Sequence, residues 1–258
     1  MSQRFASFWH GGDLSPHAHL CIKSFLDFGH EFHLYTFDRR LRVPSGCQLR
    51  DAADFYSEDE VFYYRGGTKV SAFSNMFRYR MIYETGVCWV DTDVLCMTEN
   101  FPEAEYIFAR QDKNFFNGAV LRLPLGHEAM HLAAEYCWEL RESSNWGDLG
   151  PRLLTKVIAE YGLEAKGVAT SLIYPIHWRE AMWALDPEQI SEVMRRSEGA
   201  LTFHLWNEVF CRNGVDNRVL PLDGSFLANA IVRHDVESLF LTQPWSAPMC
   251  VDILMEGH

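Results

Sequence analysis

The chain has 258 residues, of which 48% are hydrophobic and 22% are charged, as is typical of a globular protein with its own core. Its 35 acidic residues outnumber its 23 Lys and Arg residues, so the formal net charge is −12. This charge argues against a protein that binds nucleic acid through clustered cations. It remains compatible with a nucleotide that is bound through a metal ion.

The seven cysteines are scattered along the chain and none forms a CxxC pair, so neither a zinc site nor a disulfide framework is expected. Residues 1–12 lack the apolar core of a signal peptide. No stretch approaches the roughly 20 apolar residues that a membrane span needs. We therefore expect a cytoplasmic protein, with at most a peripheral contact with the inner face of a membrane.

The chain opens with a pattern typical of a strand, a helix and a second strand. Residues 5–9 form a short apolar run, and a helical pattern that starts at Ser15-Pro16 ends at Gly29. Residues 31–37 then alternate as a strand does. This order predicts two parallel strands joined by a helical crossover.

The clearest helix is expected over residues 71–84, where large apolar residues recur every three or four positions. Gly86 ends it, and residues 87–90 follow as a buried strand. The sequence Asp91-Thr92-Asp93 stands at the carboxyl end of that strand, which is where ligands bind in open α/β sheets.

The remaining elements complete an α/β pattern with no linker or internal repeat. We expect one domain over residues 1–258, with a mostly parallel central sheet flanked by helices and a C-terminal tail from 235 to 258. A short helix is expected within 51–64. The other expected strands are 106–109, 118–123 and 201–205, and the other expected helices are 127–141, 150–161, 187–196 and 225–233.

Two carboxylates one residue apart in an apolar segment need a partner for their charge. On a strand, Asp91 and Asp93 would point to the same face, and their mutual repulsion would favour a cation between them. Carboxylate oxygens suit Mg²⁺ or Mn²⁺, whose open positions are often filled by phosphates. The simpler alternative is a pair of solvated carboxylates in a turn.

The same DTDVL segment also fits haloacid-dehalogenase-like phosphatases, in which the first aspartate is the nucleophile and the second a general acid/base. That motif usually lies near the start of the chain, whereas 90 residues precede it here. The further acidic pair that such phosphatases require is not found at a later strand end.

Residues 71–94, SAFSNMFRYRMIYETGVCWVDTDV, resemble the central block of glycosyltransferase family 32 and of the α-1,4-galactosyltransferase-like sugar-binding regions, which carry a DXD motif. Further segments resemble other blocks of these families in the same order, so the resemblance extends from about residue 5 to about residue 230. These segments are FWHGG (8–12), NGAVLRLPLGHEAM (117–130), WGDLGPRLLT (146–155) and HLWN (204–207).

The resemblance implies a GT-A type fold with a single Rossmann-like domain, and a retaining transfer of a hexose from a nucleotide sugar to a glycan or lipid-linked acceptor. A UDP-hexose is the favoured donor and Mn²⁺ or Mg²⁺ the implied ion. Asp91, Asp93 and His204 would hold the metal. Trp9 would stack on the nucleobase, and Gly11 would lie in the turn beside it.

Four more residues enter through the resemblance. Arg78 would neutralise the diphosphate, and Asn117 would contact the sugar, with Gly118 allowing close approach; with Asp93 these two residues form the expected catalytic set. Asn75 departs from the families, which usually have Asp there to bind sugar hydroxyls. An inactive relative that only binds nucleotide sugars is therefore a second alternative.

Overall fold

The computed structural model describes residues 2–241. The part of the expected tail from 242 to 258 lies outside the described residues. The strands are β1 (Arg4–Phe8), β2 (Glu31–Thr36), β3 (Gln48–Asp51), β4 (Cys88–Val90), β5 (Val94–Cys96), β6 (Ile107–Arg110), β7 (Phe116–Arg122) and β8 (Thr202–His204). The α-helices are α1 (Pro16–Asp27), α2 (Ser71–Thr85), α3 (Glu128–Leu140), α4 (Leu153–Glu160), α5 (Thr170–Ile173), α6 (Ile190–Arg196), α7 (Asn207–Arg212) and α8 (Phe226–Arg233).

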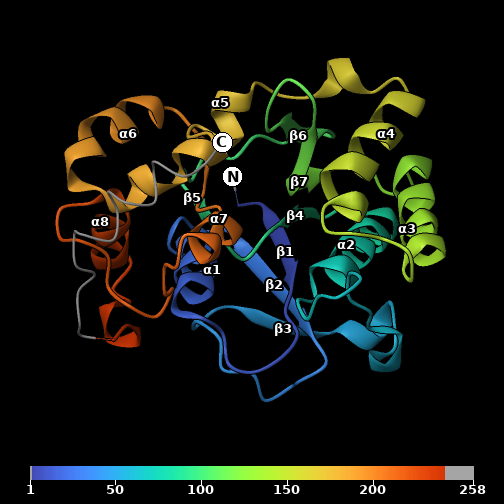
Figure 1. Cartoon of the computed structure of the whole chain (residues 1–258), viewed down its shortest axis with the longest axis horizontal. Coiled ribbons are helices and arrows are strands. Elements are labelled where there is room, and N and C mark those ends of the chain that lie inside the picture. Colours follow the sequence, from blue (N-terminus) through green and yellow to red (C-terminus); the bar gives the residue numbers. More distant parts are fainter. Residues whose placement is uncertain (1, 242–258) are drawn as a thin grey trace.

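The central sheet has six strands in the order β3-β2-β1-β4-β7-β6 (Figure 1). The neighbours from β3 to β4 pair in parallel, and only β7 is antiparallel to the strands on either side of it. The mostly parallel sheet expected from the sequence is thus confirmed. A second, two-stranded antiparallel sheet joins β5 to β8.

Helix ends follow the local chemistry of the sequence. The Ser15 side chain accepts a hydrogen bond from the Ala18 amide at the start of α1, and Pro16 occupies the first turn. Gly86 ends α2 with a φ of 64°, a conformation that glycine adopts without strain. The expected crossover helix and the expected helix over 71–84 are therefore confirmed.

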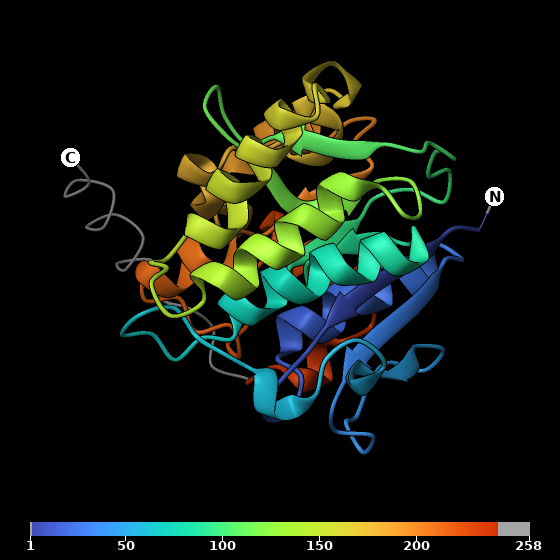
Figure 2. The ribbon, with the colours of Figure 1, turned by 90° about the vertical axis from the view of Figure 1, so that its right-hand side faces the viewer.

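Side chains that alternate along the strands divide the core between the two faces of the sheet. Phe5 packs in one cluster with α1, whereas Ala6 and Phe8 pack in the other. In β4, Trp89 faces the second cluster. Helices α2 and α3 lie side by side over this second face (Figure 2). Trp89 is thereby buried beneath α2, two residues before Asp91.

Several details differ from the sequence-based expectations. Strand β5 and helix α7 were not expected, because a segment of three or six residues gives no readable periodicity. The helix expected within 51–64 is two 3₁₀ turns, Ala52–Asp54 and Glu58–Glu60.

The helix expected over 150–161 is divided. A π-helical turn spans Asp148–Arg152, where Gly150 has non-helical φ and ψ of −96° and −112°, and α4 starts only after it. The helix expected over 187–196 begins as a 3₁₀ turn, Pro187–Gln189, and continues as α6. Within residues 2–241, no helix has the length and apolar character needed to cross a membrane.

Candidate functional site

Asp91 and Asp93 lie in the turn between β4 and β5. The Asp91 amide donates to the Ala119 carbonyl at 2.7 Å, and the Val94 amide donates to the Asp91 carbonyl at 3.1 Å. The strand ends at Val90, as expected, so the two aspartates stand in a turn and not on one face of a strand. The tight turn brings the two carboxylates together instead.

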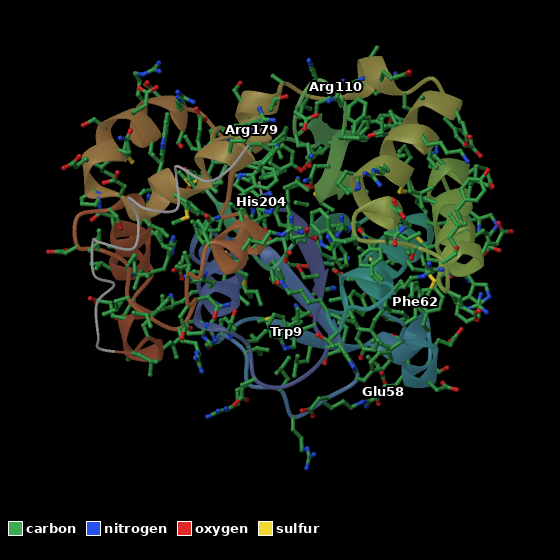
Figure 3. All side chains as sticks on the ribbon, in the orientation of Figure 1. Trp9, Glu58, Phe62, Arg110, Arg179 and His204 are labelled. Carbon is green, nitrogen blue, oxygen red and sulfur yellow. The ribbon has the colours of Figure 1, made fainter. Side chains whose placement is uncertain are left out.

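His204 completes a cluster with this pair. Ligand atoms of Asp91, Asp93 and His204 all lie within 4.8 Å of one another. Pairing of β5 with β8 sets Val94 opposite His204, which places the imidazole beside the turn. Figure 3 shows His204 near the middle of the molecule. The structure thus brings together the three residues that the sequence assigned to a metal.

The two carboxylates differ in their environments. Asp93 Oδ1 lies 3.2 Å from His204 Nε2, and its Oδ2 accepts a hydrogen bond of 2.9 Å from the Asn207 amide. Burial acts to raise the pKa of Asp93, but the attraction and hydrogen bond of His204 and the Asn207 amide outweigh it, so the pKa is lowered. The surroundings of Asp93 therefore favour its ionised form.

Burial raises the pKa of Asp91, and the nearby Asp93 carboxylate adds to this effect. Arg78 Nη2 and Trp89 Nε1 oppose it by donating to Asp91 Oδ1 at 2.8 Å and 2.7 Å. Asp91 is thus held firmly through one oxygen, while its ionised form carries an electrostatic cost that a cation would relieve.

The cluster fits a divalent cation. Two carboxylates and one imidazole are a ligand set that suits Mn²⁺ or Mg²⁺. The side chains of Asp91 and Asp93 are only 27% and 16% exposed, so their repulsion is weakly screened by solvent. A coordinated ion would compensate the charge of the two carboxylates.

Arg78 lies behind the cluster, on α2. Its side chain is almost fully buried, it bonds Asp91, and its guanidinium carbon lies 5.1 Å from the centre of the Trp89 ring. A Cβ at position 118 would collide with Arg78 Nη1. The small size of Gly118 therefore makes room for Arg78, whereas the sequence suggested room for a ligand. Contact of Arg78 with a diphosphate stays a prediction.

Asn75 and Asn117 are both engaged within the protein. Asn75 Nδ2 donates to the Tyr64 hydroxyl at 3.0 Å and to the Ser71 carbonyl at 2.8 Å. Asn117 Nδ2 donates to Gln111 Oε1, and its Oδ1 accepts from the Ala119 amide, both at 2.7 Å. Their expected contacts with a sugar stay predictions.

Trp9 follows β1 and is fixed by the glycine turn after it. Its Nε1 donates to the carbonyl oxygens of Gly11 and Gly12 at 2.8 Å and 3.1 Å. Gly11 has a φ of 88°, which a side chain would disfavour. Figure 3 shows Trp9 apart from His204. The turn orients the indole, and stacking of Trp9 on a nucleobase stays a prediction.

Sequence reasoning missed three residues that support the cluster, namely Trp89, Asn207 and His17. Asn207 donates its backbone amide to Asp93, and its Oδ1 lies 3.0 Å from Nδ1 of the buried His17 on α1. The HLWN segment signalled this region, but the contribution of a backbone amide is invisible in a sequence. His17 carried no signal at all.

The comparisons with known proteins agree with the fold and with this region. Residues 123–218 match a family model that is described as "Alpha 1,4-glycosyltransferase conserved region". This confirms the resemblance expected from the sequence, over a shorter range than the expected 5–230. The matched range includes His204 and begins after the aspartate pair.

Curated relatives carry the name lactosylceramide 4-alpha-galactosyltransferase. The protein from Pongo pygmaeus is 27% identical over 148 residues, and the human protein is 25% identical over 146 residues. Each alignment covers 52% of this chain, and they cover 66% and 41% of the two relatives. The chain thus spans only part of the length of the proteins it matches.

Among solved structures, the WbbM bifunctional glycosyltransferase aligns with a TM-score of 0.52 at 8% sequence identity. The alignment covers 93% of this chain and 52% of the other. At this identity the likeness concerns the fold alone. Together with the strand order, it confirms the GT-A type fold that the sequence suggested.

We predict that Gly118→Ala destabilises the fold by about 1–3 kcal/mol, because the added methyl group displaces the buried Arg78 guanidinium from Asp91. Urea denaturation would measure the change. The same substitution in an Arg78→Ala background should cost much less, since the colliding group is absent. Equal costs in both backgrounds would contradict this account of Gly118.

We also predict that His17→Ala weakens Mn²⁺ binding by about tenfold, as is usual when a partner of a metal-binding residue is lost. Without His17, the Asn207 side chain loses its anchor, and the amide that holds Asp93 becomes less fixed. Paramagnetic titration of Mn²⁺ would measure the affinity. His234→Ala is the matched control, because His234 is also buried and bonds an aspartate, Asp27, outside the cluster.

Proposed function

We propose that this protein is a metal-dependent, retaining glycosyltransferase that moves a hexose from a nucleotide sugar to a glycan or lipid-linked acceptor. The observation that carries the proposal is the convergence of Asp91, Asp93 and His204 at the carboxyl end of β4. The conserved region over residues 123–218 and the names of the curated relatives support the transferase class.

Asp91, Asp93 and His204 would hold the ion. Bound there, a divalent cation would neutralise the donor's diphosphate and favour its departure as a leaving group. The chain's own contribution is preorganisation. Arg78 and Trp89 fix one oxygen of Asp91, and the Asn207 amide fixes one oxygen of Asp93, so the carboxylates do not need to reorganise when the ligand arrives.

We assign a UDP-hexose as the donor and retention of configuration as the outcome, on the basis of the family resemblance. The acceptor hydroxyl would approach on the face from which the diphosphate departs, and an oxygen of that leaving group would take the acceptor's proton. A covalent glycosyl intermediate on a carboxylate of this chain, trapped with a fluorinated donor and found by mass spectrometry, would overturn this route. The cytoplasmic location expected from the sequence is part of the same proposal.

The first test is calorimetric titration of UDP and GDP, each with and without Mn²⁺. We predict that UDP binds only with the metal and that Asp93→Ala weakens this binding at least about 100-fold, the upper range for loss of a site residue around a metal. Asp186→Ala is the control, because Asp186 caps a 3₁₀ turn away from the cluster. Metal-independent binding of UDP to both proteins would contradict the assignment of the cluster.

A second test separates the enzyme from an inactive relative. We predict that the protein slowly releases UDP from UDP-galactose or UDP-glucose in the absence of an acceptor, and that EDTA or Asp91→Asn abolishes the release. Coupled detection of free UDP would follow the reaction. Tight, metal-dependent binding of UDP together with no release from any UDP-hexose or GDP-hexose would identify an inactive relative, as the departure at Asn75 suggests.

A further inference from the structure

A pocket of about 300 Å³ lies beside the start of α2 and takes no part in the cluster described above. Its wall consists of residues 64–69 together with Ser71 and Trp146. Cavities of roughly 300–1,000 Å³ are the usual size for small-molecule sites. The pocket is therefore large enough for a ligand of the size of a sugar ring.

The pocket and the metal cluster lie along one face of α2. Ser71, Asn75 and Arg78 are spaced by four and three residues, which places them on the same side of the helix. The seven helical steps from Ser71 to Arg78 span about 10 Å along the helix axis. Asn75 lies between Ser71 and Arg78 on this side of the helix and bonds the Ser71 carbonyl and Tyr64 of the pocket wall. The pocket is thus a neighbour of the cluster and distinct from it.

Helix α7 also contacts both the metal cluster and the pocket wall. Its first residue, Asn207, holds Asp93 through its amide, and the next residue, Glu208, pairs with Lys69 of the pocket wall at 2.5 Å. Figure 1 shows α7 close to the centre of the molecule. A ligand in the pocket would therefore sit beside groups that also position the cluster.

The wall chemistry suits a neutral ligand with both apolar and hydroxylated faces. Trp146 is 54% exposed, and the Arg212 guanidinium lies 4.3 Å from its ring centre. Glu208 pairs with both Lys69 and Arg212, so these two cations do not offer a free phosphate site. The exposed Arg65 of the wall can donate hydrogen bonds to hydroxyl groups. Among the described residues, the shielded Ser71 hydroxyl has no hydrogen-bond partner. An aromatic face with polar groups around it matches a pyranose ring.

We propose that this pocket is the acceptor subsite, and that it holds a neutral hexose unit of the acceptor glycan against Trp146. The inference rests on the proposed function, since it assumes that the neighbouring cluster holds the donor. It assigns recognition of the acceptor to Trp146 and the 64–69 loop. The residues of the metal cluster take no part in that recognition.

Saturation-transfer NMR tests the subsite directly. The probes are lactose and maltose, two soluble disaccharides of neutral hexoses, added to the full chain with Mn²⁺ and UDP. We expect at least one disaccharide to bind. Trp146→Ala should weaken that binding about fivefold to tenfold, the loss expected for one stacked ring, while Trp146→Phe retains most of it. Trp138→Ala is the matched control, because Trp138 is also exposed and also lies under an arginine, Arg141.

Calorimetry of UDP with Mn²⁺ on the same variants distinguishes this inference from the proposed function. Unchanged UDP affinity in Trp146→Ala, with loss of the disaccharide, supports an acceptor subsite. Equal loss of UDP would assign the pocket to the donor and overturn the proposal, as would disaccharide binding that Trp146→Ala leaves intact. Failure of both disaccharides to bind a wild-type protein that binds UDP would also overturn it. Failure of UDP to bind the wild type would reject the proposed function instead.

Discussion

The arrangement of the site depends on one electrostatic constraint, which is that two carboxylates lie close together in a turn largely shielded from water. Such a pair is unfavourable unless each charge is compensated. The surrounding elements supply that compensation separately. Arg78 on α2 and Trp89 on β4 hold Asp91, whereas His204 on β8 and the first amide of α7 hold Asp93. Two pairs of consecutive elements, separated by about a hundred residues of sequence, therefore meet at one turn.

The core is arranged so that these supports are rigid. Trp89 is buried between the sheet and α2, which lets its indole nitrogen reach Asp91 from a fixed position. Arg78 has enough space to reach the same carboxylate only because Gly118 has no side chain. Packing on one face of the sheet thus determines the charge distribution at the carboxyl end of β4. A larger side chain at position 118 would displace the Arg78 guanidinium and so weaken its attraction to Asp91.

Features with a strong local signal could be predicted from the sequence. The apolar run of β1, the alternation in β2, the helical spacing in α2 and the aspartate pair at the end of β4 were all visible, and the HLWN segment pointed to His204. Features that depend on tertiary contacts could not. Strand β5 is too short to show a period, and it exists because Val94–Cys96 pairs with a strand about a hundred residues later. The hydrogen bond from the Asn207 amide and the close packing of Arg78 on Gly118 leave no trace in residue types.

A chain reversal at Trp206 brings both His204 and the Asn207 amide to Asp93. His204 and Asn207 both reach Asp93 because the chain turns sharply between them, with Trp206 in the left-handed conformation at a φ of 57°. A non-glycine residue held in this way costs on the order of 1–3 kcal/mol. The Trp206 indole offsets that cost by donating to the Ile176 carbonyl at 3.0 Å and by packing 3.9 Å from the His204 ring. A glycine would turn more easily but would lose both contacts, so the tryptophan couples the turn to the orientation of His204.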